Sequence, residues 1–214
     1  ILAASILKGY FFSAIFNKSL LKFNIGYQGI FGFFFLILIS IISSFIINHG
    51  QIFNLCLHLI GLSGIIFFFK KKIILSKDLK YLSLVLFLTI IALYLYKNHD
   101  DFSYYHLTYS LNLSENKFII GTGIFSHGFR TFSSLFYYHS TLYLPFIKFY
   151  LFHIGPFFIL VFFNFIILKN LFEKIQENKV NFLYYFSILS LIFVDIAFYR
   201  IGEHGTDRSA QILL

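Results

Sequence analysis

Several stretches of this chain stay apolar for longer than a water-soluble fold can use. Residues 26–47 hold about twenty positions without a charged side chain, enough to cross roughly 30 Å of hydrocarbon as a helix. The whole chain is 58% hydrophobic, 22% aromatic and only 12% charged, so one soluble core cannot bury its apolar side chains. The sequence therefore predicts an integral membrane protein.

Helices are the predicted spanning elements, because a helix satisfies its own backbone hydrogen bonds inside lipid. The fold class that follows is all-α: a polytopic transmembrane helical bundle in which residues 1–214 form a single transmembrane domain. The start at Ile1, the absence of Met and the end at Leu214 indicate a fragment of a longer protein. The apolar segment 1–16 is predicted to be the end of a truncated helix or an interfacial segment. The predicted spans are 26–47, 52–69, 82–96, 149–168 and 183–199.

Lysine-rich links predict how the bundle is oriented. The chain carries 17 Lys and Arg against 9 Asp and Glu, a net charge of +8, and the lysines cluster in short links beside the apolar runs. The positive-inside rule and anionic lipids account for such clusters, so no nucleic-acid partner is expected. Links 70–80 and 169–179 are then cytoplasmic, and the loop 97–147 is extracytoplasmic.

One part of that loop needs a prediction of its own. With both lysine-rich links on the cytoplasmic side, residues 131–147 must lie along the membrane surface or re-enter it, as short interfacial helices. Polar residues such as His139 and Thr141, together with the helix breaker Pro145, favour this interpretation. A simple transmembrane helix over the same residues is the alternative, and it would move Asp207 to the other side of the membrane.

A first polar motif, Asp100-Asp101-Phe-Ser-Tyr-Tyr-His106, follows the third predicted span. Two adjacent carboxylates and an imidazole can supply a general base, part of a metal site or an ordinary solvated helix cap. No complete set of metal ligands can be read from the motif. These residues leave all three roles open.

A second motif, Gly121-Thr-Gly-Ile-Phe-Ser-His127-Gly-Phe-Arg130, is a glycine-rich loop that ends on a cation. Such a loop can approach an anion closely, and a planar guanidinium suits phosphate or pyrophosphate oxygens. Arg130 reaching towards lipid headgroups is the competing interpretation, of equal weight. The loop is neither a Walker nor a Rossmann motif, because no strand precedes it and no Gly-Lys-Ser/Thr ending follows.

A third polar cluster, Glu203-His204-Gly205-Thr206-Asp207-Arg208, follows the last predicted span. It is either a hydrophilic loop or part of a pocket shared with Asp100 and Asp101 on the same side of the membrane. Asp195 lies inside the preceding apolar run, where a carboxylate is costly unless it is paired or reaches water. Arg200 is its candidate partner.

The remaining polar residues of the apolar runs are isolated in the sequence. His49, His58 and His153 have no chemical partners nearby in the chain, so we predict that they pack between helices or lie at the interface. Cys56 is the single cysteine, which excludes a disulfide within this chain and a cysteine-rich metal site.

The first two motifs, taken in order with Ser133 and Ser134 after them, resemble a family of largely uncharacterised bacterial multi-pass membrane proteins. Thr206-Asp207 looks like the family's next motif, at the start of a further helix. The family is similar in layout to the GT-C class of integral membrane glycosyltransferases. The resemblance implies a GT-C-like bundle in the bacterial inner (cytoplasmic) membrane, with its active site facing the periplasm or exterior.

The resemblance also implies roles for individual residues. Asp100 or Asp101 would act as general base on an acceptor hydroxyl, or hold that hydroxyl, while a sugar is transferred from a polyprenyl-phosphate donor. His106 would orient the carboxylate or join it around a divalent cation. His127 and Arg130 would stabilise charge on the departing phosphate. The other substrate-binding residues implied are Ser133, Ser134, Glu203 and Asp207.

Two other functions compete with the glycosyltransferase. A transporter or flippase of lipid-linked saccharides would also carry polar residues within its spans, and Asp195 fits it equally well. Transport sites tend towards the bilayer midplane, however, whereas most acidic residues here lie near one interface. In a noncatalytic assembly subunit, Asp100 and Asp101 would be dispensable. The expected partners are a polyprenyl-phosphate sugar donor, a glycan, lipid or protein acceptor, and membrane lipids.

Overall fold

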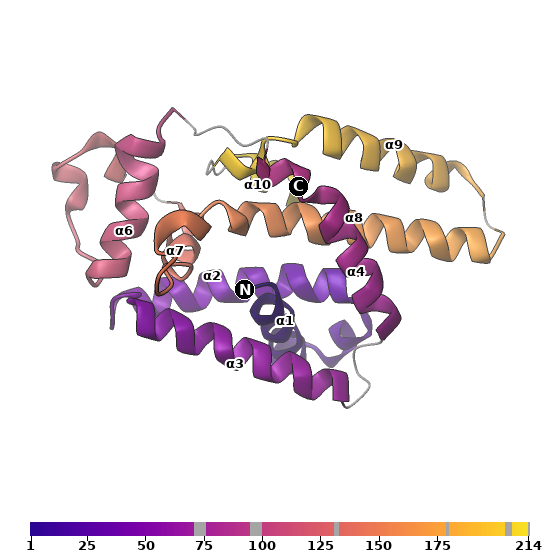
Figure 1. Ribbon diagram of the computed structural model, residues 1–214, viewed down its shortest axis with the longest axis horizontal. Helices are drawn as coiled ribbons and strands as arrows, with labels where there is room; N and C mark the ends of the chain where they lie inside the picture. The colour runs from indigo at the N-terminus through magenta and orange to yellow at the C-terminus, as the bar shows by residue number, and fades with distance from the viewer. Residues whose placement is uncertain (71–75, 95–99, 131–132, 179, 204–206, 214) are drawn as a thin grey trace.

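The computed structural model describes residues 1–70, 76–94, 100–130, 133–178, 180–203 and 207–213, and these residues form helices and their connections (Figure 1). Within the described residues no strand forms, and the one β-bridge joins Leu144 to Lys148. The predicted all-helical fold class is confirmed. The longer helices are α1 (Leu2–Phe16), α2 (Ile25–Ser44), α3 (Gln51–Lys70), α4 (Ser76–Thr89), α8 (Ile154–Gln176) and α9 (Phe182–Ala197). The shorter ones are η1 (Lys18–Lys22), α5 (Ile91–Tyr94), η2 (Phe102–His106), α6 (Leu107–Glu115), η3 (Thr122–Ile124), η4 (His127–Arg130), α7 (Ser134–Ser140), η5 (Phe149–Leu151), η6 (Ile201–Glu203) and α10 (Asp207–Leu213).

Three helical segments in the described part of the chain are long and apolar enough to cross a membrane. They are α2, α3 and the continuous segment of η5 and α8, Phe149–Gln176. Each overlaps a predicted span, although the third extends well past residue 168 into the charged link. Helix α9 is apolar but has only 16 residues. A membrane protein is therefore indicated by these helices.

The predicted span 82–96 differs from the structure. Helix α4 begins earlier, at Ser76 within the lysine-rich link, and ends at Thr89, after which the short α5 follows. The break coincides with three successive β-branched residues, Thr89-Ile90-Ile91, which lose side-chain freedom in a helix. Residues 95 and 96 lie outside the described part of the chain.

Helices α1 and α2 form a tightly packed pair. A Cβ atom added to Gly32 would lie 1.5 Å from the carbonyl oxygen of Ser5, and one added to Gly9 would lie 1.7 Å from that of Gln28. The two backbones therefore touch directly, as small residues allow between helices in lipid. Segment 1–16, predicted to be the end of a truncated helix or an interfacial segment, forms helix α1, and one side of this helix is buried against α2 and α3.

The packing of α2 against α8 gives the bundle two distinct ends. Gly26 lies against Ile166, and Gly29 lies against Phe162, so the two helices run in opposite directions. The start of α2 therefore meets the end of α8, where Lys169 lies 3.0 Å from the Asp78 carboxylate on α4. This is the lysine-rich end of the bundle.

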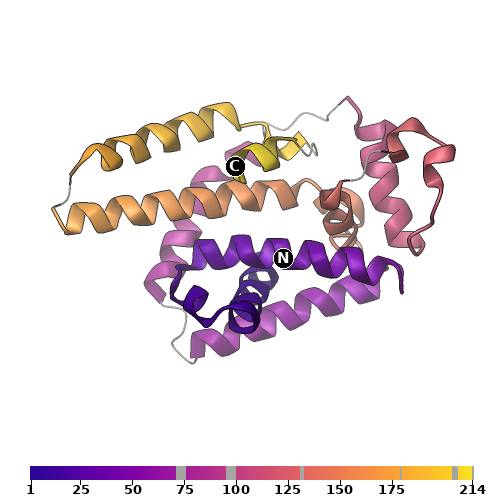
Figure 2. The same cartoon turned by 180° about the vertical axis from the view of Figure 1, so that it is seen from behind.

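Helices α6 and α7 occupy the opposite end, the α6–α7 end (Figures 1 and 2). Helix α6 is attached to the link between α2 and α3: His49 N donates to Leu113 O at 2.9 Å, and Asn48 Nδ2 donates to Glu115 O at 3.0 Å. Helix α7 lies within segment 131–147, which we expected at the membrane surface or re-entering. Its side chains from Leu135 to Ser140 are all buried, chiefly against α2 and α6.

We expect Gly32→Ala to destabilise the chain, because the new Cβ atom forces the backbones of α1 and α2 apart. Overpacking of this kind costs about 1–3 kcal/mol. The midpoint of thermal unfolding in detergent, followed by far-ultraviolet circular dichroism, should fall. Gly50→Ala is the matched control, because a Cβ atom there has no neighbour closer than 3.8 Å. Equal midpoints for the two variants would contradict the close contact.

Candidate functional site

The acidic motif opens a π-helical turn at the α6–α7 end. The carbonyl oxygen of Asp101 accepts from the backbone N–H of Tyr105 at 3.1 Å and of His106 at 3.4 Å. Single π turns are rare and are found frequently at functional sites. Asp100 is exposed, whereas Asp101 is half-buried and accepts a 3.5 Å hydrogen bond from the Tyr105 hydroxyl. The turn therefore fixes one of the two carboxylates beside a phenol.

The glycine-rich motif folds into the two short turns η3 and η4. Gly121 has φ of +89°, a conformation that glycine adopts without strain. Arg130 closes the loop, because its Nε donates to the carbonyl oxygen of Gly123 at 3.0 Å. Arg130 and His127 are both exposed. One donor of the guanidinium thus holds the loop and orients the charged group.

The structure brings these two motifs together. Gly128 packs on the side chain of Tyr105, so closely that an added Cβ atom would lie 2.4 Å from the Tyr105 Cβ. Tyr105 is also the residue that donates to Asp101. The segment that carries the carboxylate and the segment that carries the cation therefore pack together through Tyr105, and these two kinds of group can serve proton removal and anion stabilisation. We call this arrangement the Tyr105–Gly128 site.

His106 is buried beside the acidic turn. It is only 3% exposed, and its ring lies edge-on to Tyr105 with centroids 4.4 Å apart and 5.0 Å from the ring of Phe136 on α7. It belongs to an aromatic cluster that supports the acidic turn. Among the described residues no group of three His, Cys, Asp or Glu side chains lies close enough to hold a metal ion.

The other predicted site residues lie on neighbouring elements. Ser133 and Ser134 are half-buried at the start of α7. Glu203 ends η6, and Asp207 begins α10. The backbone of these two acids is described, but their side chains fall outside the described part. Helix η6 packs mainly against α5 and α8, and α10 packs mainly against α8. His204 also lies outside the described part of the chain.

A buried polar cluster that the sequence did not predict holds α7 in place. The side-chain amide of Asn54 on α3 lies 2.7 Å from the carbonyl oxygen of His49 and 2.9 Å from those of Ser140 and Tyr143. His58 lies four residues after Asn54 on α3, and its Nε2 donates to the carbonyl oxygen of Thr141 at 3.0 Å. These donors satisfy the carbonyl groups of Thr141 and Tyr143 in the turn that follows α7, and they add to the hydrogen bond that Ser140 O accepts from Tyr143 N at 3.3 Å.

His49 connects the same cluster to α2. Its Nε2 lies 2.8 Å from the Ser43 hydroxyl, and its Nδ1 bonds the Ser140 hydroxyl. Because that hydroxyl donates to Tyr137 O at 2.7 Å, we assign the ring proton to Nδ1 and the acceptor role to Nε2. Burial lowers the pKa of His49 to about 4, so the ring is neutral near neutral pH.

A usable signal for this cluster was present in the sequence. Asn54 and His58 are four residues apart, so they occupy one face of the second predicted span. Two polar side chains on one face of an apolar helix indicate a polar partner inside the bundle. The prediction treated the histidines singly and so missed the pattern. His58 does pack between helices, as predicted.

Asp195 on α9 has a hydrogen-bond partner on α8. Its Oδ1 accepts a 2.6 Å hydrogen bond from Asn164 Nδ2 on α8. Val194 is the one buried residue of α9, so most of this apolar helix is exposed. The pair therefore places a hydrogen-bonded carboxylate at the seam between two apolar helices.

Comparison of the chain with protein-family models, curated proteins and solved structures found no match.

We expect the stability of the chain to fall as pH drops from about 6.5 to about 4. The folded state disfavours protonated His49, whereas the unfolded chain takes up the proton near pH 6.5. The shift corresponds to a loss of at most about 3 kcal/mol. Urea unfolding in detergent across this pH range measures it. His49→Gln, which keeps a polar group without titrating, should show a smaller decline; identical pH profiles would contradict the role of His49.

Proposed function

We propose that this protein is a membrane glycosyltransferase, or part of one, which moves a sugar from a polyprenyl-phosphate donor to an extracytoplasmic acceptor. The observation that carries the proposal is the packing of Gly128 on Tyr105, which joins the acidic turn to the cationic loop. Transfer from a lipid phosphate requires a base for the acceptor hydroxyl and positive charge for the leaving phosphate. The Tyr105–Gly128 site offers both.

In this mechanism Asp101 is the base and Arg130 the anion-binding group. The Tyr105 hydroxyl orients one carboxylate oxygen of Asp101, and the acceptor hydroxyl would give its proton to the other. The Arg130 guanidinium would bind the phosphate through donors other than the Nε–H that already bonds Gly123. Exposed His127 would add a second donor to the same phosphate.

The cationic loop also carries apolar side chains suited to a lipid donor. Ile120, Ile124 and Phe125 are 87%, 84% and 86% exposed, on the same loop as Arg130. A prenyl chain that stays in lipid while its phosphate meets Arg130 would contact such side chains. The proposed setting is the outer face of a bacterial inner membrane, with a glycan, lipid or protein as acceptor.

A transporter or flippase of lipid-linked saccharides is the second candidate, and the Asn164–Asp195 pair favours it. A carboxylate between two apolar helices is costly, and in membrane proteins such groups commonly line substrate or proton pathways. Under this alternative, Asp195→Asn should stop transport of a labelled lipid-linked sugar across vesicles. Under the glycosyltransferase proposal, sugar transfer should survive that substitution.

We expect Asp101→Asn to lower sugar transfer by on the order of a hundredfold or more, because the amide cannot accept the acceptor's proton. Transfer is measured in vesicles supplied with a radiolabelled polyprenyl-phosphate sugar. Glu115→Gln is the control, since it removes an exposed carboxylate at the end of α6 and should leave transfer unchanged. Activity that survives both Asp100→Asn and Asp101→Asn would exclude the proposed mechanism.

The proposal further requires positions 101 and 207 to face the same side of the membrane. After Cys56→Ser removes the single native cysteine, Asp101→Cys and Asp207→Cys can be tested separately with a membrane-impermeant maleimide. Both should react from the outside of intact spheroplasts. Reaction of the two positions from opposite sides would exclude a shared extracytoplasmic site.

A further inference from the structure

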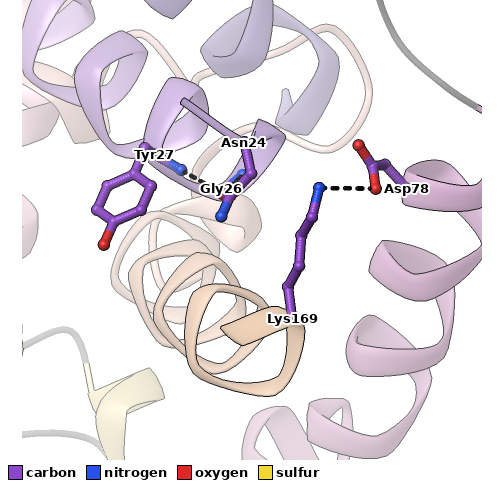
Figure 3. A network of polar contacts seen from close by, with 5 residues as sticks. All are labelled: Asn24, Gly26, Tyr27, Asp78 and Lys169. Carbon is purple, nitrogen blue, oxygen red and sulfur yellow. Dashed lines mark hydrogen bonds and ion pairs between the residues drawn. The ribbon is translucent and has the colours of Figure 1, made fainter. Parts of the chain in front are cut away.

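A polar pocket opens at the lysine-rich end of the bundle, remote from the Tyr105–Gly128 site. Its volume is about 520 Å³, within the range of small-molecule sites. It lies where the start of α2 faces the end of α8 and the start of α4 (Figure 3). Its polar lining includes Lys22, Asn24, Asp78, Lys169 and Glu173.

The charges of this lining are balanced. Lys22 and Lys169 supply two positive charges, and Asp78 and Glu173 supply two negative ones. Lys169 and Asp78 are paired at 3.0 Å, whereas Lys22 and Glu173 are exposed. A purely anionic ligand would meet two carboxylates in this pocket. A ligand that carries one positive and one negative group matches the lining better, because each charge finds an opposite partner.

Asn24 does not contribute a free helix terminus to the pocket. Its Oδ1 accepts hydrogen bonds from the backbone N–H groups of Gly26 at 3.0 Å and Tyr27 at 3.3 Å, and so caps α2 (Figure 3). The first donors of this helix are therefore already used. Recognition of a ligand in the pocket must come from its charged side chains.

A small apolar pocket of about 20 Å³ lies beside the polar pocket, between α4 and α8. Lys169 lines both pockets, and the lining of the small one also includes Leu84, Val85, Phe165 and Leu168. Lysine-rich links mark the water boundary of membrane helices, so a charged pocket beside apolar side chains at this end of the bundle suits the headgroup of an amphipathic molecule.

We propose that the pocket binds the headgroup of a membrane phospholipid that carries both a phosphate and a primary amine, with its acyl chains in the surrounding lipid. Lys22 binds the phosphate, and Glu173 binds the ammonium group. The Lys169–Asp78 pair forms the wall between them and joins α4 to α8. The proposal does not depend on the proposed glycosyltransferase, because it uses residues at the opposite end of the bundle.

The absence of tryptophan from the chain permits a direct test. Phe23, a 45% exposed residue of the pocket wall, is replaced in Phe23→Trp to give a single fluorophore. Brominated phosphatidylethanolamine or phosphatidylglycerol with identical acyl chains is added to the protein in detergent, and quenching is followed. Phosphatidylethanolamine should reach half-maximal quenching at about a tenfold lower mole fraction, the gain expected from one charge-assisted hydrogen bond.

Variants made in the Phe23→Trp background show which side chain binds which charged group of the lipid. Glu173→Gln should remove the preference for phosphatidylethanolamine, and Lys22→Gln should weaken quenching by both lipids, because both carry a phosphate. Glu115→Gln at the far end of the bundle should change neither. Equal quenching by the two lipids in the parent protein, or a preference that survives Glu173→Gln, would overturn the proposal. Because both replaced side chains are exposed, circular dichroism should report an unchanged fold.

Discussion

The position of α7 depends on the hydrogen bonds that α3 donates to Ser140 and to the turn that follows α7. A turn buried in an apolar bundle presents carbonyl groups that no helical hydrogen bond satisfies, and in lipid no water replaces the missing partner. The Asn54 amide lies within 2.9 Å of the carbonyl oxygens of Ser140 and Tyr143, and His58 donates to Thr141. Irregular backbone is therefore tolerated here because polar side chains of a long apolar helix reach it.

The candidate site depends on that placement. The ring of Phe136 on α7 has its centroid 5.0 Å from that of His106 and 5.4 Å from that of Tyr109, and so it supports the acidic turn. The acidic turn then holds Tyr105 against Gly128 of the cationic loop. Loss of the α3 contacts would thus disturb the acidic turn through the packed rings of Phe136, His106 and Tyr105, and the cationic loop through the contact of Tyr105 with Gly128.

The sequence predicted the helical class from its long uncharged runs and the two ends of the bundle from its lysine-rich links. Both signals depend on composition alone. It also placed the acidic motif and the cationic loop in one segment, and the structure adds their contact through Tyr105 and Gly128. The break after Thr89 was missed because hydropathy does not register β-branching. The Asn54 cluster was missed because the polar residues of the second span were considered one at a time, and because two of its partners, the carbonyl groups of Ser140 and Thr141, are more than eighty residues away.

Hydrogen exchange of residues 134–142, followed by mass spectrometry in nanodiscs, tests the role of Asn54 most directly. We expect these amides to be as protected as those of α2 in the parent chain. In Asn54→Ala they should exchange much faster, while the amides of α8 stay protected. Rapid exchange of 134–142 in the parent chain, or protection that is unchanged in Asn54→Ala, would contradict the dependence of α7 and the adjoining site on α3.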